Sequence, residues 1–199
     1  MGIRDAAARL FRPTEIDIRD ASKFDLLDVG SKEPSDWESA SLQSAADTLL
    51  LPGCAFRMIE HIDALRVDGG PHGLGFVLGS TTVDPSAWFF KAHFYQDPVW
   101  PGSLGLESFL QLLKVYAIER WGERLASTHR FEGIATGLPH TWAYRGQIIP
   151  ANKRVEVSAT ITRCEGGDAP LVMANGFLTV DGTTIYEMRD FGMRIVHHQ

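Results

Sequence analysis

Residues 103–121 read SLGLESFLQLLKVYAIERW, and this stretch decides the fold. Its apolar residues recur at helical spacing and spread around most of the circumference, which is typical of a helix that is buried on nearly every side. Pro101 and Gly102 directly precede this stretch and mark the start of the helix, and Ser103 can serve as the N-cap. Gly122 marks the end. The sequence therefore predicts one long central helix over residues 103–121.

Five strand-like segments flank this helix, two before it and three after it. They are residues 55–67, 73–83, 134–149, 154–163 and 171–196. Turn signals at Gly69-Gly70-Pro71 and Asp181-Gly182 separate neighbouring strands. An antiparallel sheet that wraps around the helix is the natural way to bury it. We therefore expect an α+β fold with one central helix.

Composition sets the broad class. The chain has 199 residues, 44% of them hydrophobic and 22% charged, as in an ordinary globular protein. Residues 1–50 are acidic and poor in aromatics, so we expect an N-terminal extension or linker there and one folded domain over residues 51–199.

The net charge and the lengths of the apolar runs argue against some binding partners and cellular locations. The net charge of −6 comes without a basic run, which argues against nucleic acid and against an anionic membrane surface. No apolar run approaches the ~18–20 residues that span a bilayer. We expect no signal peptide, because the first ten residues are charged and short of apolar residues. We expect a cytoplasmic protein, and the histidines show no metal-ligand spacing.

A second stretch, HFYQDPVWPGSLGLE at residues 93–107, carries the candidate chemistry. His93 is a candidate general base, because a neutral imidazole titrates near the working pH. Glu107 lies among leucines, and an apolar environment favours the protonated carboxyl that a general acid needs.

Two more residues can assist this pair. The backbone N–H of Gly102 lies at the predicted helix N-terminus, free of intrahelical partners and backed by the helix dipole, so it can donate to an oxyanion. Gln111 follows Glu107 by four residues on the same helix face, and its amide can orient the carboxylate.

The amino-acid sequence of these segments resembles the active-site signature of FabA-like 3-hydroxyacyl-carrier-protein dehydratases, which have the hotdog fold. The likeness covers about residues 51–196 and rests on residues 88–94, 97–99 and 101–107. Residues 146–150 and 186–195 resemble two further family segments. Residues 92–114 are most similar to the dehydratase domains of polyunsaturated fatty acid and polyketide synthases.

The resemblance implies a (3R)-hydroxyacyl-carrier-protein dehydratase that releases a trans-2-enoyl thioester and water. It implies no cofactor and no metal, since the substrate is carried on the phosphopantetheine of an acyl carrier protein. It also implies a homodimer with composite active sites, in which His93 of one subunit meets Glu107 of the other.

The resemblance further implies roles for neighbours of the catalytic pair. Asp97, Pro101 and Ser103 are assigned to support the motif, while Phe94, Val99 and Trp100 are assigned to the substrate tunnel. Three residues depart from the family pattern. Trp100 occupies the position where the commoner family residue is methionine. Ser103 replaces the cysteine of the bacterial dehydratase-isomerase, and Glu107 replaces that enzyme's aspartate.

Other functions stay open on the sequence. A hotdog thioesterase would use Glu107 with water, although His93 in the dehydratase position argues against it. A non-catalytic hotdog that grips a carrier protein is the third alternative. An added trans-2 to cis-3 isomerase activity would need the same two groups and a particular tunnel shape.

Overall fold

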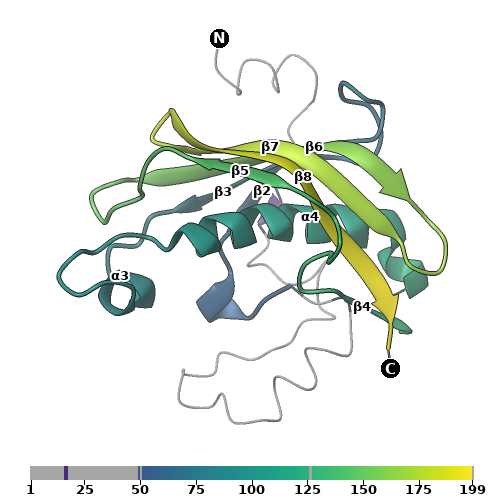
Figure 1. Cartoon of the computed structure of the whole chain (residues 1–199), viewed down its shortest axis with the longest axis horizontal. Coiled ribbons are helices and arrows are strands. Elements are labelled where there is room, and N and C mark those ends of the chain that lie inside the picture. The colour runs from purple at the N-terminus through teal and green to yellow at the C-terminus, as the bar shows by residue number, and fades with distance from the viewer. Residues whose placement is uncertain (1–15, 18–48, 50, 126, 199) are drawn as a thin grey trace.

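The computed structural model describes residues 16–17, 49, 51–125 and 127–198. An antiparallel sheet curls over one long helix, α4 (Gly102–Leu125), and the short helix α3 (Trp88–Ala92) lies near the start of α4 (Figure 1). The remaining elements are β1 (Ile16–Asp17), the 3-10 turn η4 (Cys54–Phe56), β2 (His61–Arg66), β3 (Phe76–Thr82), β4 (His129–Phe131), β5 (Thr141–Tyr144), β6 (Arg154–Glu165), β7 (Leu171–Val180) and β8 (Thr183–His197).

The strands follow the order β1-β2-β3-β6-β7-β8-β4, and β5 also pairs with β8. All pairings are antiparallel. The long strand β8 binds β7 along one edge, while its other edge binds β5 near Tyr186–Arg189 and β4 near Ile195–His197. In the described part of the chain β5 pairs with β8 only, so its second edge is unpaired there.

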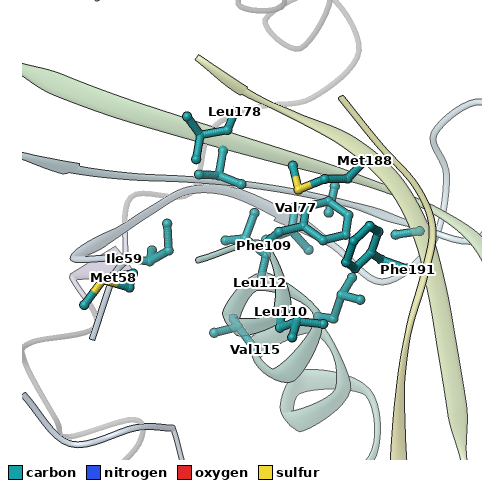
Figure 2. Packing of buried hydrophobic residues seen from close by; sticks show 14 of the residues in the cluster. Met58, Ile59, Val77, Phe109, Leu110, Leu112, Val115, Leu178, Met188 and Phe191 are labelled. Carbon is teal, nitrogen blue, oxygen red and sulfur yellow. The ribbon is translucent and has the colours of Figure 1, made fainter. Parts of the chain in front are cut away.

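The core lies between α4 and the concave face of the sheet. Every residue from Ser108 to Ala117 is buried. Figure 2 shows Phe109 of α4 against Met188 and Phe191 of β8, and the two phenyl rings meet edge to face with centroids 5.8 Å apart. Burial of each such side chain stabilises the fold by about 1.5–3 kcal/mol. Packing therefore fixes the position of α4, as the sequence predicts.

The ends of the central helix differ from the prediction. The helix begins at Gly102, so Ser103 lies inside the first turn and is not the N-cap. It continues through Gly122 to Leu125, because the buried Trp121 and Leu125 join the core. That burial outweighs the ~1 kcal/mol that a glycine costs within a helix.

Two strands also differ. The segment predicted as a strand over residues 134–149 forms only β5, because Gly137 and Pro139 interrupt its first half. The sequence reasoning missed β4, which precedes this loop, and the short helix α3. The remaining strands confirm the predicted order, and an antiparallel sheet around one long helix is the hotdog fold that the resemblance implies.

The predicted extension, residues 1–50, lies outside the described residues apart from 16–17 and 49. The division of the chain at residue 50 stays a prediction.

Candidate active site

His93 follows directly after α3 and is held by backbone groups. Its N–H donates to the Phe89 carbonyl at 3.0 Å, and its ring Nδ1 lies 3.3 Å from the Val99 carbonyl oxygen. Because a carbonyl oxygen only accepts, this contact places the proton of the neutral ring on Nδ1 and leaves the lone pair on Nε2. The ring is exposed and stacks on Phe94 with centroids 4.0 Å apart. This is the arrangement that a general base needs.

The turn between α3 and α4 is also fixed through its backbone. The Val99 N–H donates to the Asp97 carbonyl at 3.0 Å, and the Trp100 N–H donates to the Ile148 carbonyl at 2.9 Å. Asp97 therefore supports the turn with its main chain. Its exposed carboxylate makes no hydrogen bond within the described residues. The position of His93 depends little on any polar side chain of this turn.

The three residues assigned to the substrate tunnel have different surroundings. Phe94 is 52% exposed, whereas Val99 and Trp100 are buried. The Trp100 indole packs against Phe89 and Phe90 of α3, at centroid distances of 4.7 and 6.4 Å. The indole Nε1 is buried and has no hydrogen-bond partner among the described residues. The tryptophan at the family's methionine position thus joins α3 to the core, and a tunnel role for these residues stays a prediction.

The start of α4 places an N–H group where the sequence expects one. The Pro101 carbonyl accepts from the N–H groups of Leu104 and Gly105, at 3.0 and 3.3 Å, so Pro101 caps the first turn with its main chain. Gly102 is the first helical residue, and N–H groups at this position have no acceptor within the helix. Ser103 is exposed.

Aromatic side chains cover this first turn. A Cβ on Gly102 would lie 3.0 Å from the Trp142 ring and 3.4 Å from the Tyr144 ring, both on β5. A Cβ on Gly105 would overlap the ring of Tyr186 on β8. Glycine at both positions lets the helix start come this close to the sheet edge.

Glu107 is held by two donors from its own helix. Its Oε1 accepts from Gln111 Nε2 and from Lys114 Nζ, each at 3.1 Å, while no donor contacts Oε2 within the described residues. The Glu107 side chain is 24% exposed and that of Lys114 is 10% exposed. Both donors belong to buried residues, so they fix the position of Oε1 from inside the fold.

Gln111 has a second set of contacts. Its Oε1 accepts from the N–H groups of Met58 and Ile59, at 2.9 and 3.3 Å, and its Nε2 donates to the Phe56 carbonyl at 2.8 Å. This amide therefore uses all of its hydrogen-bonding capacity. It ties the acid, the helix and the segment that leads into β2 into one unit.

Within one chain the structure does not bring the predicted base and acid into contact. The ring of His93 contacts Phe94 and Val99, and Glu107 contacts Gln111 and Lys114 of α4. No hydrogen bond or ion pair joins His93 to Glu107 among the described residues. A site that uses both groups has to be completed in another way.

Comparison with known proteins places this geometry in a family. The sequence matches the FabA-like domain over residues 51–189, which is more than half of the chain. The chain belongs to the FabA-like family. The FabA-like match spans α3, the turn and α4, so it includes both His93 and Glu107.

The expected likeness to polyunsaturated fatty acid synthases is also confirmed. Over 144 residues, the FabA-like chain is 38% identical to one of the subunits of the polyunsaturated fatty acid synthase of Thraustochytrium sp.. The alignment covers 69% of this chain and 9% of the relative. The chain therefore spans less than a tenth of that relative's length.

One solved structure supports the fold, and a second match is weaker. The dehydratase heterocomplex ApeI:P of Xenorhabdus doucetiae matches with a TM-score of 0.50 and 13% identity, over 78% of this chain and 91% of that one. AziG of S. sahachiroi matches with a TM-score of 0.44 and 9% identity, over 69% of this chain and 90% of that one. At 13% identity the first match supports the hotdog fold alone, and the second, with a TM-score under 0.5, supports no argument.

The described residues also bear on metals and membranes. They hold no cluster of three or more His, Cys, Asp or Glu side chains that could bind a metal ion. None of the helices found in them is long and apolar enough to cross a bilayer.

Sequence reasoning missed Lys114 and the aromatic cover at the start of α4. The signal for Lys114 is its spacing of seven residues from Glu107, which is about two helical turns and the same face. The signal for the cover is the pair Gly102 and Gly105, one turn apart, with Trp142 and Tyr144 on alternate positions of a strand.

Proposed function

We propose that this chain is a (3R)-hydroxyacyl-carrier-protein dehydratase, acting on an acyl group that a carrier protein holds through phosphopantetheine. The observation that carries the proposal is the His93 ring, whose Nδ1 faces the Val99 carbonyl and whose Nε2 keeps its lone pair. Membership of the FabA-like family supports it, as does the likeness to a component of a fatty acid synthase.

His93 acts as the general base and Glu107 as the general acid. Nε2 of His93 takes the proton from C2 of the substrate, and the electron pair of that bond forms the C2–C3 double bond. The C3–O bond breaks, and the proton of Glu107 joins the leaving hydroxide as water. Proton transfer from the imidazolium to the Glu107 carboxylate, through solvent, restores both groups. An acid–base pair of this kind contributes about 10²–10⁴ in rate.

The Gly102 N–H would receive the charge that develops on the thioester oxygen. It lies at the positive end of a helix 24 residues long. Removal of one such donor in other enzymes costs about 10²–10³ in kcat.

We further propose that two copies of the chain form a dimer with composite sites, His93 from one and Glu107 from the other. Two observations support this. His93 and Glu107 have separate contacts within one chain. The edge strand β5 presents an unpaired edge among the described residues and carries the part-exposed Trp142 and Tyr144, features that favour pairing with another strand.

The activity is tested with 3-hydroxyacyl thioesters, loaded on N-acetylcysteamine and on an acyl carrier protein. We expect enoyl thioester and water, and His93→Ala and Glu107→Gln each to lower kcat by about 10²–10⁴. His72→Ala, which changes an exposed histidine in the β2–β3 turn, is the control. Release of free acid without enoyl product would show a thioesterase instead, and full turnover by either variant would refute the proposal.

Mixing the two inactive variants tests the dimer. After unfolding and refolding together, half of the dimers are mixed, and each mixed dimer holds one intact composite site. Activity should recover to roughly a quarter of the wild-type value. No recovery, with mixed dimers verified by two affinity tags, would place His93 and Glu107 of each site in one chain.

A further inference from the structure

Lys114 is a charged residue in the interior of the fold. It lies in the run Ser108–Ala117, in which every residue is buried, and its side chain is 10% exposed. An ammonium group in such a place is expensive unless it is paired. It is paired with Glu107, with Nζ 3.1 Å from Oε1. The helix geometry explains the contact, because side chains on a helix lean toward its N-terminus.

The two oxygens of the Glu107 carboxylate have different hydrogen-bond partners. Lys114 and Gln111 both donate to Oε1 of Glu107. Oε2 has no donor in the described part of the chain and belongs to a side chain that is 24% exposed. One oxygen is therefore fixed from inside the protein, and the other is left for a group that arrives from outside.

Stability alone does not account for this pair. Buried ion pairs commonly stabilise a fold no more than apolar residues of similar size would. Leucine and valine fill the neighbouring positions of α4, so an apolar residue at position 114 would suit the core. The pairing of this buried lysine with Glu107 points to a role at the carboxylate.

We infer that Lys114 is a positioning residue of the proposed dehydratase: it fixes Oε1 of Glu107, turns Oε2 toward the substrate hydroxyl, and stabilises the carboxylate that forms as the proton leaves. This inference rests on the proposed function. As Glu107 transfers its proton to the leaving hydroxyl, negative charge develops on the carboxyl group. The Lys114 ammonium and the Gln111 amide are already aimed at that charge, so neither has to reorganise during the reaction.

Other charged groups near this face are few. The segment that Gln111 ties to α4 contributes Arg57 and Glu60, which flank Met58 and Ile59 and are both half-buried. The Glu60 carboxylate accepts from the Thr82 N–H at 3.1 Å, which directs it to the end of β3. In the helix itself the next charged residues are Glu119 and Arg120, both further along α4. Lys114 is thus the cation that contacts the Glu107 carboxylate.

The test compares Lys114→Met with Lys114→Arg in the full-length chain. Methionine keeps the length and removes the charge, and arginine keeps the charge. We expect Lys114→Met to lower kcat by about 10- to 100-fold while KM changes by less than about twofold. Lys114→Arg should recover part of that loss. Lys153→Met, at an exposed lysine, should behave as wild type.

The split between kcat and KM separates positioning from a structural role. Loss of positioning should lower kcat with KM nearly unchanged, and arginine should recover part of kcat because it returns a cationic donor to Oε1. Equal loss of kcat in both variants, or a kcat loss that follows a fall in thermal stability, would assign Lys114 a structural role only. If methionine prevents folding, Lys114→Gln gives the same uncharged comparison.

Failure of this inference is distinguishable from failure of the proposed function. Wild-type kinetics in a folded Lys114→Met chain, with His93→Ala inactive, would remove Lys114 from the site and leave the dehydratase intact. Turnover that survives in His93→Ala would instead refute the function on which the inference rests.

Discussion

The two halves of the candidate site are held in different ways. His93 is exposed and is positioned by main-chain groups: its own N–H, the Val99 carbonyl and the hydrogen-bonded turn after it. Glu107 lies on a buried helix face and is positioned by two side chains, Gln111 and Lys114. The base therefore tolerates changes of neighbouring side chains, whereas the acid depends on them.

Among the changes that test this difference, we expect the largest effect from Gln111→Leu. Leucine leaves the N–H groups of the buried Met58 and Ile59 without their acceptor, and each buried unsatisfied group costs about 1–3 kcal/mol. We expect the free energy of unfolding to fall by about 2–4 kcal/mol and kcat to fall with it. Urea unfolding measures the first effect.

The control is Gln147→Leu, at an exposed glutamine next to the buried Ile148. It should change the free energy of unfolding by less than about 0.5 kcal/mol. If both leucine variants unfold at the same urea concentration, the acid does not depend on Gln111.

A second test concerns two buried tyrosines, Tyr186 of β8, which lies against the start of α4, and Tyr116 in the interior of α4. Tyr186 packs on Gly105 and beside the Tyr144 ring, with centroids 5.0 Å apart, and its buried hydroxyl makes no hydrogen bond of normal geometry within the described residues. Tyr116 instead donates to the Leu74 carbonyl at 2.6 Å. Burial raises the pKa of both hydroxyls above the usual value near 10.

The sign of the pH effect follows from linkage. Below pH 10 both tyrosines are neutral in the folded and unfolded chains, so stability is unaffected. Above pH 10 the unfolded chain ionises first, and stability falls by about 1.4 kcal/mol per pH unit for each tyrosine. In each of the variants Tyr186→Phe and Tyr116→Phe, the free energy of unfolding should fall less steeply above pH 10, because one ionising hydroxyl is gone. Urea unfolding at pH 9, 10 and 11 measures this slope. An unchanged slope in either variant would contradict the burial of that hydroxyl.

At pH 8 the two variants should differ. Tyr116→Phe gives up a hydrogen bond worth about 1 kcal/mol, whereas Tyr186→Phe removes a hydroxyl without such a bond and should be neutral or slightly stabilising.

The smallest effect is expected at Trp100. Trp100→Phe keeps an aromatic ring beside Phe89 and removes the buried Nε1, and the main-chain bond to Ile148 is unchanged. We expect a change in unfolding free energy below about 1.5 kcal/mol and a kcat within about threefold of wild type. A kcat loss as large as that of Gln111→Leu would show that the turn, and His93 with it, depends on this side chain.

The sequence predicts the central helix well, and it predicts that strands precede and follow this helix along the chain, because apolar periodicity reports burial directly. Leu112, Leu113 and Tyr116 are fully buried as their spacing requires. The contact of Gln111 with Glu107 is also predictable, since residues four apart share a helix face.

Other features need the folded chain. A lysine in a helix usually indicates a solvated face, so the residue type hides the burial of Lys114, and only its apolar neighbours and its spacing from Glu107 point to it. The packing of Trp100 on α3 is likewise hidden, because the sequence does not predict that short helix. The relation of His93 to Glu107 in the proposed dimer depends on a second copy, and the spacing of two residues in one chain carries no information about contacts between chains.

The saturated amide of Gln111 also has a dynamic consequence. The same side chain binds Glu107 and the main chain of Phe56, Met58 and Ile59. Any fluctuation that lifts this segment from α4 must therefore release the carboxylate at the same moment. The rate at which the amide protons of Met58 and Ile59 exchange with solvent reports how often the acid loses its alignment.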